Sequence, residues 1–329
     1  MTGLAGRRWP AEWEPHAATA FTWPHNPDTW HQGLDGPRRA LGEAIHALAD
    51  GEHIHLHCHD ADTARRTEDR LGLRDDQLTV HTLPSDDAWC RDHGAIVVRE
   101  SDGRRVALDF GYNAWGGKYP PWSNDAAMAA RMARYLTLPH ERIDVVLEGG
   151  AIEGNGQGLV MTTASCVLNP NRNADMGRAR FEAVLADALG YADVIWLEGG
   201  LAGDDTDGHI DNLARFVHPT CAVVASTTGP DDVSAALRTQ AHDLGVRLDV
   251  HMLPSPEAFI REHQLPASYA NFYIANRVVL VPVFGDPADR AALELLESLF
   301  TGRTIVPIDA RDLVVGLGTL HCLTQQIPA

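Results

Sequence analysis

The stretch that says most about the fold is Val146-Leu-Glu-Gly-Gly150, because it returns fifty residues later as Trp196-Leu-Glu-Gly-Gly200. In both places an apolar segment that reads as a strand ends in Glu-Gly-Gly. Two glycines let the chain turn tightly and place the adjacent side chain at the edge of a cleft. The echo therefore predicts a fold of repeated units, each made of strands and a helix.

Strand-like and helix-like segments alternate on both sides of this echo. We expect strands at residues 95–98, 143–147, 158–161, 221–225, 278–283 and 303–308, where short apolar runs occur. We expect helices at residues 125–136, 175–189 and 286–300, where apolar residues recur at helical spacing. No low-complexity linker or charge block divides the chain. The sequence thus predicts a single α/β domain over residues 1–329.

The charge of the chain limits the class of its ligands. It has 27 Lys and Arg against 45 Asp and Glu, a formal net charge of −18. Binding to nucleic acid needs clustered basic residues, so we expect no nucleic-acid partner. A cleft lined by carboxylates concentrates cations, which makes a cationic ligand plausible. Acidity that serves only solubility explains the same numbers.

The cysteines and the apolar segments indicate a cytoplasmic protein. The first ten residues show no apolar run after their basic pair, and nothing approaches the roughly 20 apolar residues of a membrane span. We therefore expect neither a secretory signal nor a membrane partner. The five cysteines are dispersed and lack Cys-x-x-Cys spacing, which argues against disulfides and structural zinc. They are Cys58, Cys90, Cys166, Cys221 and Cys322.

The segment Gly316-Leu-Gly-Thr-Leu-His-Cys322 marks a candidate nucleophile. Most cysteines are small buried hydrophobic residues, and that interpretation stays open here. The flanking glycines and His321 instead give Cys322 the polar setting that a reactive thiolate needs. Its unperturbed pKa of about 8.5 falls only beside a cation or a dipole, and a cationic substrate could supply that charge.

A candidate acid/base pair lies in Gly203-Asp-Asp-Thr-Asp-Gly-His-Ile-Asp211. If residues 208–211 form a strand, His209 and Asp211 point to the same side, into one cleft. That would place an acid/base group beside a carboxylate. A solvated turn, or part of a metal site, is the competing interpretation.

Two further carboxylates complete the set more weakly. Asp92 ends Asp86-Asp-Ala-Trp-Cys-Arg-Asp92 and could simply pair with Arg91; Glu148 could be an ordinary loop residue. Cys90 is the alternative nucleophile, since strand alternation would place it on the same face as Asp92. One thiol, one histidine and several carboxylates suit attack on a cationic carbon, of which guanidinium is the common biological example.

The run Glu52-His-Ile-His-Leu-His-Cys-His59 offers a different class of function. On a strand, His53, His55, His57 and His59 would share one face, and imidazoles so arranged can bind zinc, nickel or copper. No distal pair of ligands completes such a site in the sequence. A half-exposed strand with histidine on its polar face is the interpretation that we favour.

Taken together, these segments resemble the agmatine deiminase family, within the guanidine-modifying group that includes bacterial peptidylarginine deiminases. The resemblance spans nearly the whole chain, in order. It is carried by residues 10–16, 23–25, 86–92, 110–122, 147–150, 168–173, 203–212, 267–273 and 321–326. It implies five ββαβ modules around a pseudo-fivefold axis, the pentein-like α/β propeller.

The resemblance also implies roles for the candidate residues. Cys322 would be the nucleophile, His209 the general acid/base, Asp92 and Asp211 the groups that hold the guanidinium, and Glu148 a neighbour of His209. We expect substrate-binding roles for Asp86, Trp89, Trp115, Asp205 and Gly318. No metal or organic cofactor is implied. The reaction would convert a small cationic guanidine, first of all agmatine, to N-carbamoylputrescine and ammonia, and a homo-oligomer is possible.

One departure from the family's pattern concerns the substrate. The family typically reads Gly-Gly-Gly-Asn-Ile-His-Cys before the nucleophile, whereas Leu317 and Thr319 here replace a glycine and the asparagine. We hypothesise that both alter the far end of the pocket rather than the thiol. Deimination of arginine, peptidyl-arginine or another guanidine, transfer of the amidino group to an amine, non-catalytic binding in the acidic pocket, and metal binding by residues 53–59 on an inactive scaffold remain the alternatives.

Overall fold

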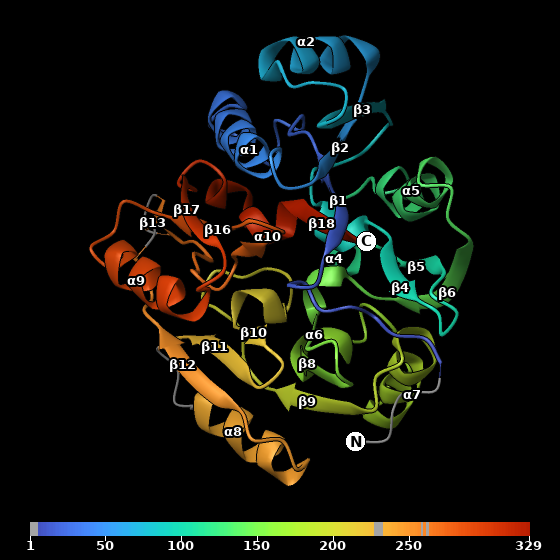
Figure 1. Ribbon diagram of the computed structural model, residues 1–329, viewed down its shortest axis with the longest axis vertical. Helices are drawn as coiled ribbons and strands as arrows, with labels where there is room; N and C mark the ends of the chain where they lie inside the picture. Colours follow the sequence, from blue (N-terminus) through green and yellow to red (C-terminus); the bar gives the residue numbers. More distant parts are fainter. Residues whose placement is uncertain (1–5, 227–232, 258, 261–262) are drawn as a thin grey trace.

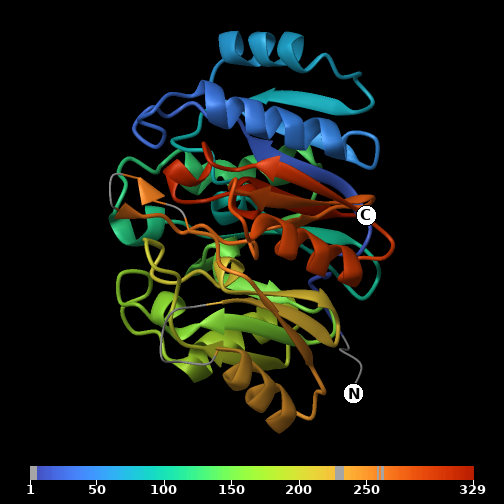
Figure 2. The same cartoon turned by 90° about the vertical axis from the view of Figure 1, so that its left-hand side faces the viewer.

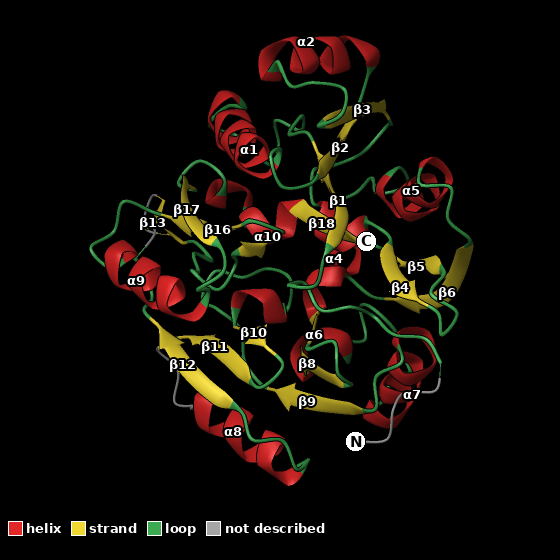
Figure 3. Cartoon of the chain, viewed as in Figure 1, coloured by secondary structure: helices red, strands yellow, loops and turns green. Residues whose placement is uncertain are grey.

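The computed structural model describes residues 6–226, 233–257, 259–260 and 263–329 (Figure 1). Within them the strands form six sheets (Figure 3). In sheet order they are β18 (Thr324–Pro328), β1 (His16–Thr22), β2 (His53–Cys58) and β3 (Leu78–Thr82); β4 (Ile96–Arg99), β5 (Arg105–Gly111) and β6 (His140–Val146); β7 (Ile152–Gly154), β8 (Leu159–Thr163) and β9 (Asp193–Leu197); β10 (Ala214–His218), β11 (Cys221–Ala225) and β12 (Asp249–Leu253); β15 (Tyr273–Ile274), β16 (Val278–Val283) and β17 (Thr304–Asp309); and the short pair β13 (Phe259–Ile260) and β14 (His263–Gln264).

Long helices connect the strands, and the loops of the chain contain short helical turns. The helices are α1 (Asp35–Leu48), α2 (Ala61–Leu71), α5 (Met128–Tyr135), α7 (Arg178–Leu189), α8 (Val233–Asp243) and α9 (Asp289–Leu299). The turns are α3 (Cys90–His93), α4 (Ala114–Gly117), α6 (Ala164–Val167), α10 (Leu320–Leu323), η1 (Asp125–Ala127), η2 (Gly149–Ala151), η3 (Ile210–Asn212) and η4 (Val314–Gly316). Figure 1 shows the long helices toward the outside and α4 and α10 near the middle.

Five of the sheets repeat one pattern of pairing. In each, the first strand pairs antiparallel with the second, and the second pairs parallel with a third. A parallel pair needs a long crossover, and α1, α5, α7, α8 and α9 supply it. The first unit combines both chain ends, because β18 pairs with β1. β3 and α2 extend that unit at one end of the molecule (Figure 2).

The fold confirms the mixed α/β class and the expected elements. The strands and helices predicted from apolar runs and helical spacing are all present, with ends shifted by a few residues at most. The two Leu-Glu-Gly-Gly strings both follow the last strand of a unit, β6 and β9, as a repeat predicts. Their environments differ, because Glu148 is buried whereas Glu198 is exposed and pairs with Arg178. Among the described helices none is long and apolar enough to cross a membrane.

The histidine run is the strand β2, and its rings are used in contacts within the fold. His55 Nδ1 lies 3.0 Å from His81 Nε2, and His57 Nε2 lies 2.9 Å from the hydroxyl of Tyr135. His53 contacts Thr79. His59 follows the strand, where it contacts the carbonyl of Ser85 and stacks on His25. The groups of metal-ligand type that the described residues form lie elsewhere.

This cluster makes the fold sensitive to acid. Burial, with the nearby charges of His81 and His53, lowers the pKa of His55 to about 3. Burial also lowers the pKa of His57 and of His81. The unfolded chain protonates its histidines near pH 6.5, so it binds more protons than the folded chain below that pH. Stability is therefore expected to fall as the pH drops from about 6.5 toward 3.

The variant His55→Gln removes one of these sites. We expect it to flatten the pH slope of the free energy of unfolding between pH 6.5 and 5 by up to about one proton. Urea titrations at several pH values measure that slope. His242→Gln is the control, because His242 is exposed on α8 and should leave the slope unchanged. Equal slopes for wild type and His55→Gln would contradict this role of the cluster.

Candidate active site

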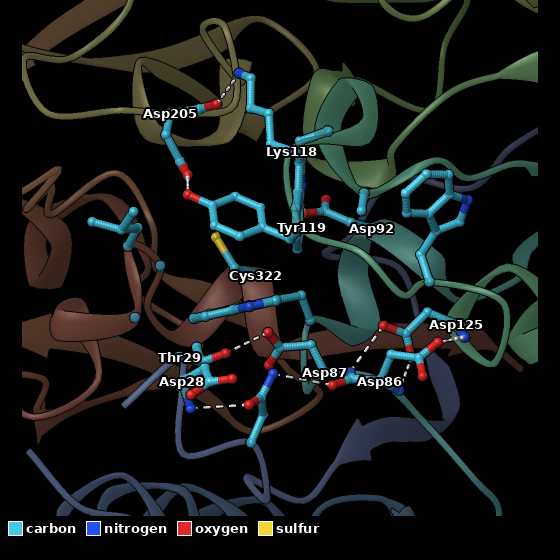
Figure 4. A pocket seen from close by; sticks show the side chains of 18 of the residues that line it. Asp28, Thr29, Asp86, Asp87, Asp92, Lys118, Tyr119, Asp125, Asp205 and Cys322 are labelled. Carbon is cyan, nitrogen blue, oxygen red and sulfur yellow. Dashed lines mark hydrogen bonds between the residues drawn. The ribbon is translucent and has the colours of Figure 1, made fainter. Parts of the chain in front are cut away.

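One cavity of about 980 Å³, shown from close by in Figure 4, is lined in part by the turns α4 and α10, which lie near the middle of the molecule in Figure 1. Eight of the ten predicted site residues line it: Asp86, Trp89, Asp92, Trp115, Asp205, His209, Gly318 and Cys322. Asp211 and Glu148 do not line it and are buried behind its wall. The residues come from five separate stretches of the chain, so the fold assembles what the sequence disperses.

Cys322 lies on the turn α10, at the floor of this cavity. Gly318 precedes it and packs against Trp89, where an added Cβ would come within 2.5 Å of the indole ring. Leu317 adopts a left-handed backbone with φ +71°, which starts this tight approach. Burial raises the pKa of the Cys322 thiol well above its ordinary value, and the charges of Asp211 and Asp92 raise it further.

The prediction of a strand at residues 208–211 is wrong. His209 caps the 3₁₀ turn η3, so Asp211 belongs to a helical turn rather than to an alternating strand. His209 faces the cavity, whereas Asp211 turns beneath it toward His321. The two side chains are still neighbours of one site, because a 3₁₀ turn brings nearby residues together.

The two carboxylate oxygens of Asp211 differ in their contacts. His321 Nδ1 lies 2.7 Å from its Oδ2, and Cys322 Sγ lies 3.6 Å from the same oxygen. Burial opposes the charge of Asp211, but His321 outweighs this and lowers the pKa of the carboxyl. Its Oδ1 is buried and has no partner among the described residues. The Oδ1 atom is therefore an available acceptor on a carboxylate whose other oxygen approaches the sulfur.

Asp92 lies on the helical turn α3, so the strand alternation assumed for Cys90 is wrong. Cys90 is fully buried and does not line the cavity, and burial raises the pKa of its thiol to about 12. Asp92 instead reaches the cavity, where its Oδ1 accepts from the backbone N–H of Gly150 at 3.0 Å and its Oδ2 accepts from the Trp115 indole at 3.0 Å.

The acidic groups approach one another because residue 150 is glycine. An added Cβ there would lie 2.6 Å from His209 Nδ1, 2.8 Å from Asp92 Oδ1 and 3.1 Å from Asp211 Oδ2. The glycine of the Leu-Glu-Gly-Gly string therefore makes room for the side chains rather than only for a turn. No larger residue fits at this point without moving them.

The imidazole of His209 lies between two carboxylates without a close hydrogen bond. Its Nδ1 is 3.7 Å from Asp92 and its Nε2 is 3.9 Å from Glu148. Burial opposes protonation, but Asp92, Cys166 and Glu148 outweigh it and raise the pKa of His209 well above its usual range. Burial, together with the charges of Asp211 and Glu148, raises the pKa of Asp92 to about 6. The site can therefore exchange protons.

Glu148 has a partner of its own, Arg172, whose Nε donates to it at 2.7 Å. Burial opposes its charge, but His209 and Arg172 together lower the pKa of Glu148. No role for Arg172 is predicted from the sequence, although it lies in the segment Leu168–Asn173 that carries the resemblance. Its guanidinium fixes the carboxylate next to His209.

The predicted substrate-binding residues have different contacts. Trp115 lies in a run of four left-handed residues, 114–117, and orients Asp92. Asp205 accepts a hydrogen bond from Tyr119, above the sulfur in the view of Figure 4. The Asp86 carboxylate accepts hydrogen bonds from the side-chain amide and the backbone N–H of Asn124, so it stabilises the loop at the far end of the cavity.

Two groups of described residues bring three ligands of metal type together: Glu148, Cys166 and His209, and on the β11–β12 sheet Cys221, Asp249 and His251. In the first group the guanidinium of Arg172 already donates a hydrogen bond to the Glu148 carboxylate. A divalent cation there would face a guanidinium, which disfavours it. The second group is partly exposed, and none of its residues lines the cavity. We assign a metal to neither.

Comparison with known proteins decides the family. A family model described as Porphyromonas-type peptidyl-arginine deiminase matches residues 8–328. The chain belongs to this family. An agmatine deiminase of Pseudomonas aeruginosa (strain LESB58) is 36% identical over 361 residues, which cover 98% of this chain and 96% of the relative.

Solved structures of the same kind share the fold. The agmatine deiminase of Enterococcus faecalis matches with a TM-score of 0.90 at 30% identity, over 98% of this chain and 96% of that one. A substrate-bound variant of the C. jejuni agmatine deiminase matches with a TM-score of 0.87 at 28% identity, with the same coverage. The resemblance that the sequence motifs indicated is confirmed.

Sequence reasoning missed the residues beneath the site of this deiminase family member. Glu12 accepts from Arg215 at 2.8 Å and from Arg91 at 3.1 Å, and its Oε2 lies 2.8 Å from His321 Nε2. Burial opposes its charge, but Arg215, His321 and Arg91 hold its pKa well below the ordinary range. Glu12 lies in a segment that carries the resemblance, yet nothing local in Pro10-Ala-Glu-Trp13 indicates these distant partners.

Removal of this carboxylate should destabilise the whole protein. Glu12→Gln leaves Arg91, Arg215 and His321 buried with less negative charge, and breaking a buried ion pair typically costs about 3–5 kcal/mol. Urea unfolding measures the loss. Glu14→Gln is the matched control two residues away, because Glu14 pairs with the half-exposed Arg8 and should change stability by less than about 1 kcal/mol. Equal effects would refute a special role for Glu12.

Proposed function

We propose that this member of the Porphyromonas-type peptidyl-arginine deiminase family hydrolyses a C–N bond of a small guanidine, with agmatine as the first candidate substrate. The observation that carries the proposal is the buried Asp211 carboxylate, whose Oδ2 lies 3.6 Å from Cys322 Sγ and whose Oδ1 has no partner among the described residues, with Asp92 and His209 close to each other in the same site. The agmatine deiminases that resemble the chain over nearly its whole length support the choice of agmatine.

The carboxylates would hold the substrate for attack. A guanidinium donates through several N–H groups in one plane, which suits bonds to two carboxylates at once. Asp211 and Asp92 offer acceptors on the side of the site where the sulfur lies. A guanidinium held there presents its central carbon to Cys322, and such positioning supplies up to roughly 7–11 kcal/mol of a barrier.

The reaction then proceeds in two halves. The Cys322 thiol first loses its proton to solvent as the cationic substrate binds, and the thiolate then attacks the central carbon and forms a tetrahedral adduct. Protonated His209 gives its proton to the departing nitrogen, and ammonia leaves. The remaining S-alkylthiouronium is attacked by water, whose proton His209 accepts, and the C–S bond breaks. The products are the ureido compound, N-carbamoylputrescine in the case of agmatine, and the free thiol.

The finer fold assignment belongs to the same proposal. We propose that the five ββαβ units form the pentein-like α/β propeller over residues 1–329, with the site at its centre. The repeated strand pairing and the position of α10 near the middle support it. A cytoplasmic location stays a prediction from the cysteine pattern, and a homo-oligomer stays a prediction from the family resemblance.

A substrate panel tests the function directly. Release of ammonia and ureido product from agmatine, arginine, a blocked arginine peptide and other guanidines is measured for wild type and Cys322→Ser. We expect turnover of agmatine and at least a thousandfold loss in the variant, because serine is a far weaker nucleophile here. Turnover that requires an added amine would instead indicate amidino transfer. Residual activity above one tenth would contradict Cys322 as the nucleophile.

The two departures from the family's motif separate in this structure. Leu317 lines the cavity, as expected for a residue that shapes the far end of the pocket. Thr319 is buried and does not line the cavity; its hydroxyl donates to Asn271 Oδ1 at 2.7 Å. The expectation that Thr319 alters the pocket rather than the thiol is therefore wrong, because its contact leads toward Cys322.

Leu317→Gly should change substrate preference without a loss of stability. A left-handed leucine costs about 1–2 kcal/mol that glycine avoids, and the missing side chain widens the cavity. We expect the ratios of kcat/KM among guanidines to move by roughly tenfold or more. Leu265→Ala widens the same cavity without a strained backbone and is the control. Unchanged substrate ranking in Leu317→Gly, alone and with Thr319→Asn, would refute the role of Leu317.

A further inference from the structure

Burial and two nearby carboxylates oppose ionisation of the Cys322 thiol. Asp211 Oδ2 lies 3.6 Å from the sulfur, and burial together with the charges of Asp211 and Asp92 raises the pKa of the thiol. A nucleophile in such a place needs a donor that favours negative charge on sulfur. Among the described residues one side-chain N–H group reaches it, that of Asn271, whose Nδ2 lies 3.2 Å from Sγ.

The orientation of the Asn271 amide is fixed by its other contacts. Its Oδ1 accepts from the backbone N–H of His321 at 3.1 Å and from the hydroxyl of Thr319 at 2.7 Å. A backbone N–H can only donate, so the oxygen must face this loop and the NH₂ group must face away from it. One hydrogen of Nδ2 goes to Asn212 Oδ1 at 3.0 Å, which leaves the other for the sulfur.

The same amide serves both protonation states of the sulfur. A neutral thiol can donate to Asn271 Oδ1, 3.5 Å away, or to Asp211. A thiolate can accept from Nδ2 without any movement of the side chain. Because Asn271 is almost fully buried, it makes these contacts in a setting where hydrogen bonds to charge are strong.

We propose that Asn271 is a further catalytic residue, whose amide N–H stabilises negative charge on Sγ of Cys322 during attack and during expulsion of the thiolate from the thiouronium. Thr319 is a positioning residue that acts through it. This inference rests on the proposed function for its place in the reaction, but its effect on the sulfur exists without substrate.

Alkylation of Cys322 provides a measurement that needs no substrate. The rate at which iodoacetamide modifies Cys322 is followed against pH by peptide mass spectrometry, which separates it from the four other cysteines. Asn271→Asp keeps the shape but places an acceptor at the sulfur. We expect alkylation at pH 8 to slow by roughly 10- to 100-fold and its pH midpoint to rise, since hydrogen bonds to charged groups have about this strength.

Two further variants separate a lost donor from an added charge and from general damage. Asn271→Ala removes the donor without adding charge, and we expect the same direction with a smaller shift. If Asn271→Asp does not fold, the alkylation rates of Asn271→Ala and Thr319→Val measure the effect. For Thr319→Val we expect an alkylation rate within a few-fold of wild type. Ser268→Ala is the control, because Ser268 donates to the Asn212 carbonyl at 2.7 Å in the same loop without touching the sulfur.

The outcomes distinguish this inference from the proposed function. Slower alkylation in the Asn271 variants, with Ser268→Ala like wild type, supports the inference even if no guanidine is turned over. Unchanged pH dependence of alkylation in folded Asn271→Asp and Asn271→Ala overturns it, even if agmatine is a substrate. An equal shift in Ser268→Ala would assign the effect to loop disorder and also overturns it. Once turnover is established, kcat of the Asn271 variants should fall in parallel with their alkylation rates, whereas KM should change little.

Discussion

The buried carboxylate of Glu12 is the constraint on which the site depends. Its three ionisable partners each lie close in sequence to a residue of the site. Arg91 precedes Asp92, His321 precedes Cys322, and Arg215 follows Asp211 by four positions. One anion thus fixes three segments that the chain separates by more than a hundred residues. Burial of so many charges is unfavourable unless every one is paired, so the network admits few alternative arrangements.

The carboxylates of the site, which lie above the Glu12 network, are not fully paired with positive charges. Beneath, charges are paired. Above, Asp92 faces the cavity with a pKa raised to about 6, and Asp211, buried behind the wall of the cavity, has one oxygen without a partner among the described residues. Gly150 permits this crowding of like charges. A bound guanidinium would relieve it, and the cation would at the same moment offset the charges that disfavour a thiolate. Substrate binding and activation of the nucleophile would then be one electrostatic event.

Periodicity predicted the local structure well, because strands such as Val278–Val283 are buried on both faces and read as continuous apolar runs. The cavity also contains most of the residues chosen for their chemistry. The errors lie in short turns. Residues 208–211 and 90–93 were interpreted with strand alternation, whereas helical turns aim Asp211 downward and bury Cys90. The Glu12 network could not be predicted from the sequence, because its partners lie up to 309 residues away and leave no local pattern.

The motif before the nucleophile shows how one short segment can control two properties separately. Leu317 keeps the left-handed backbone that glycine would adopt without strain, so its side chain is retained against a local cost and faces the cavity. Thr319, two residues on, turns inward to the Asn271 amide beside the sulfur. Because the two side chains point to different neighbours, substitution at one alters the space available to a substrate, and substitution at the other alters the reactivity of the thiol.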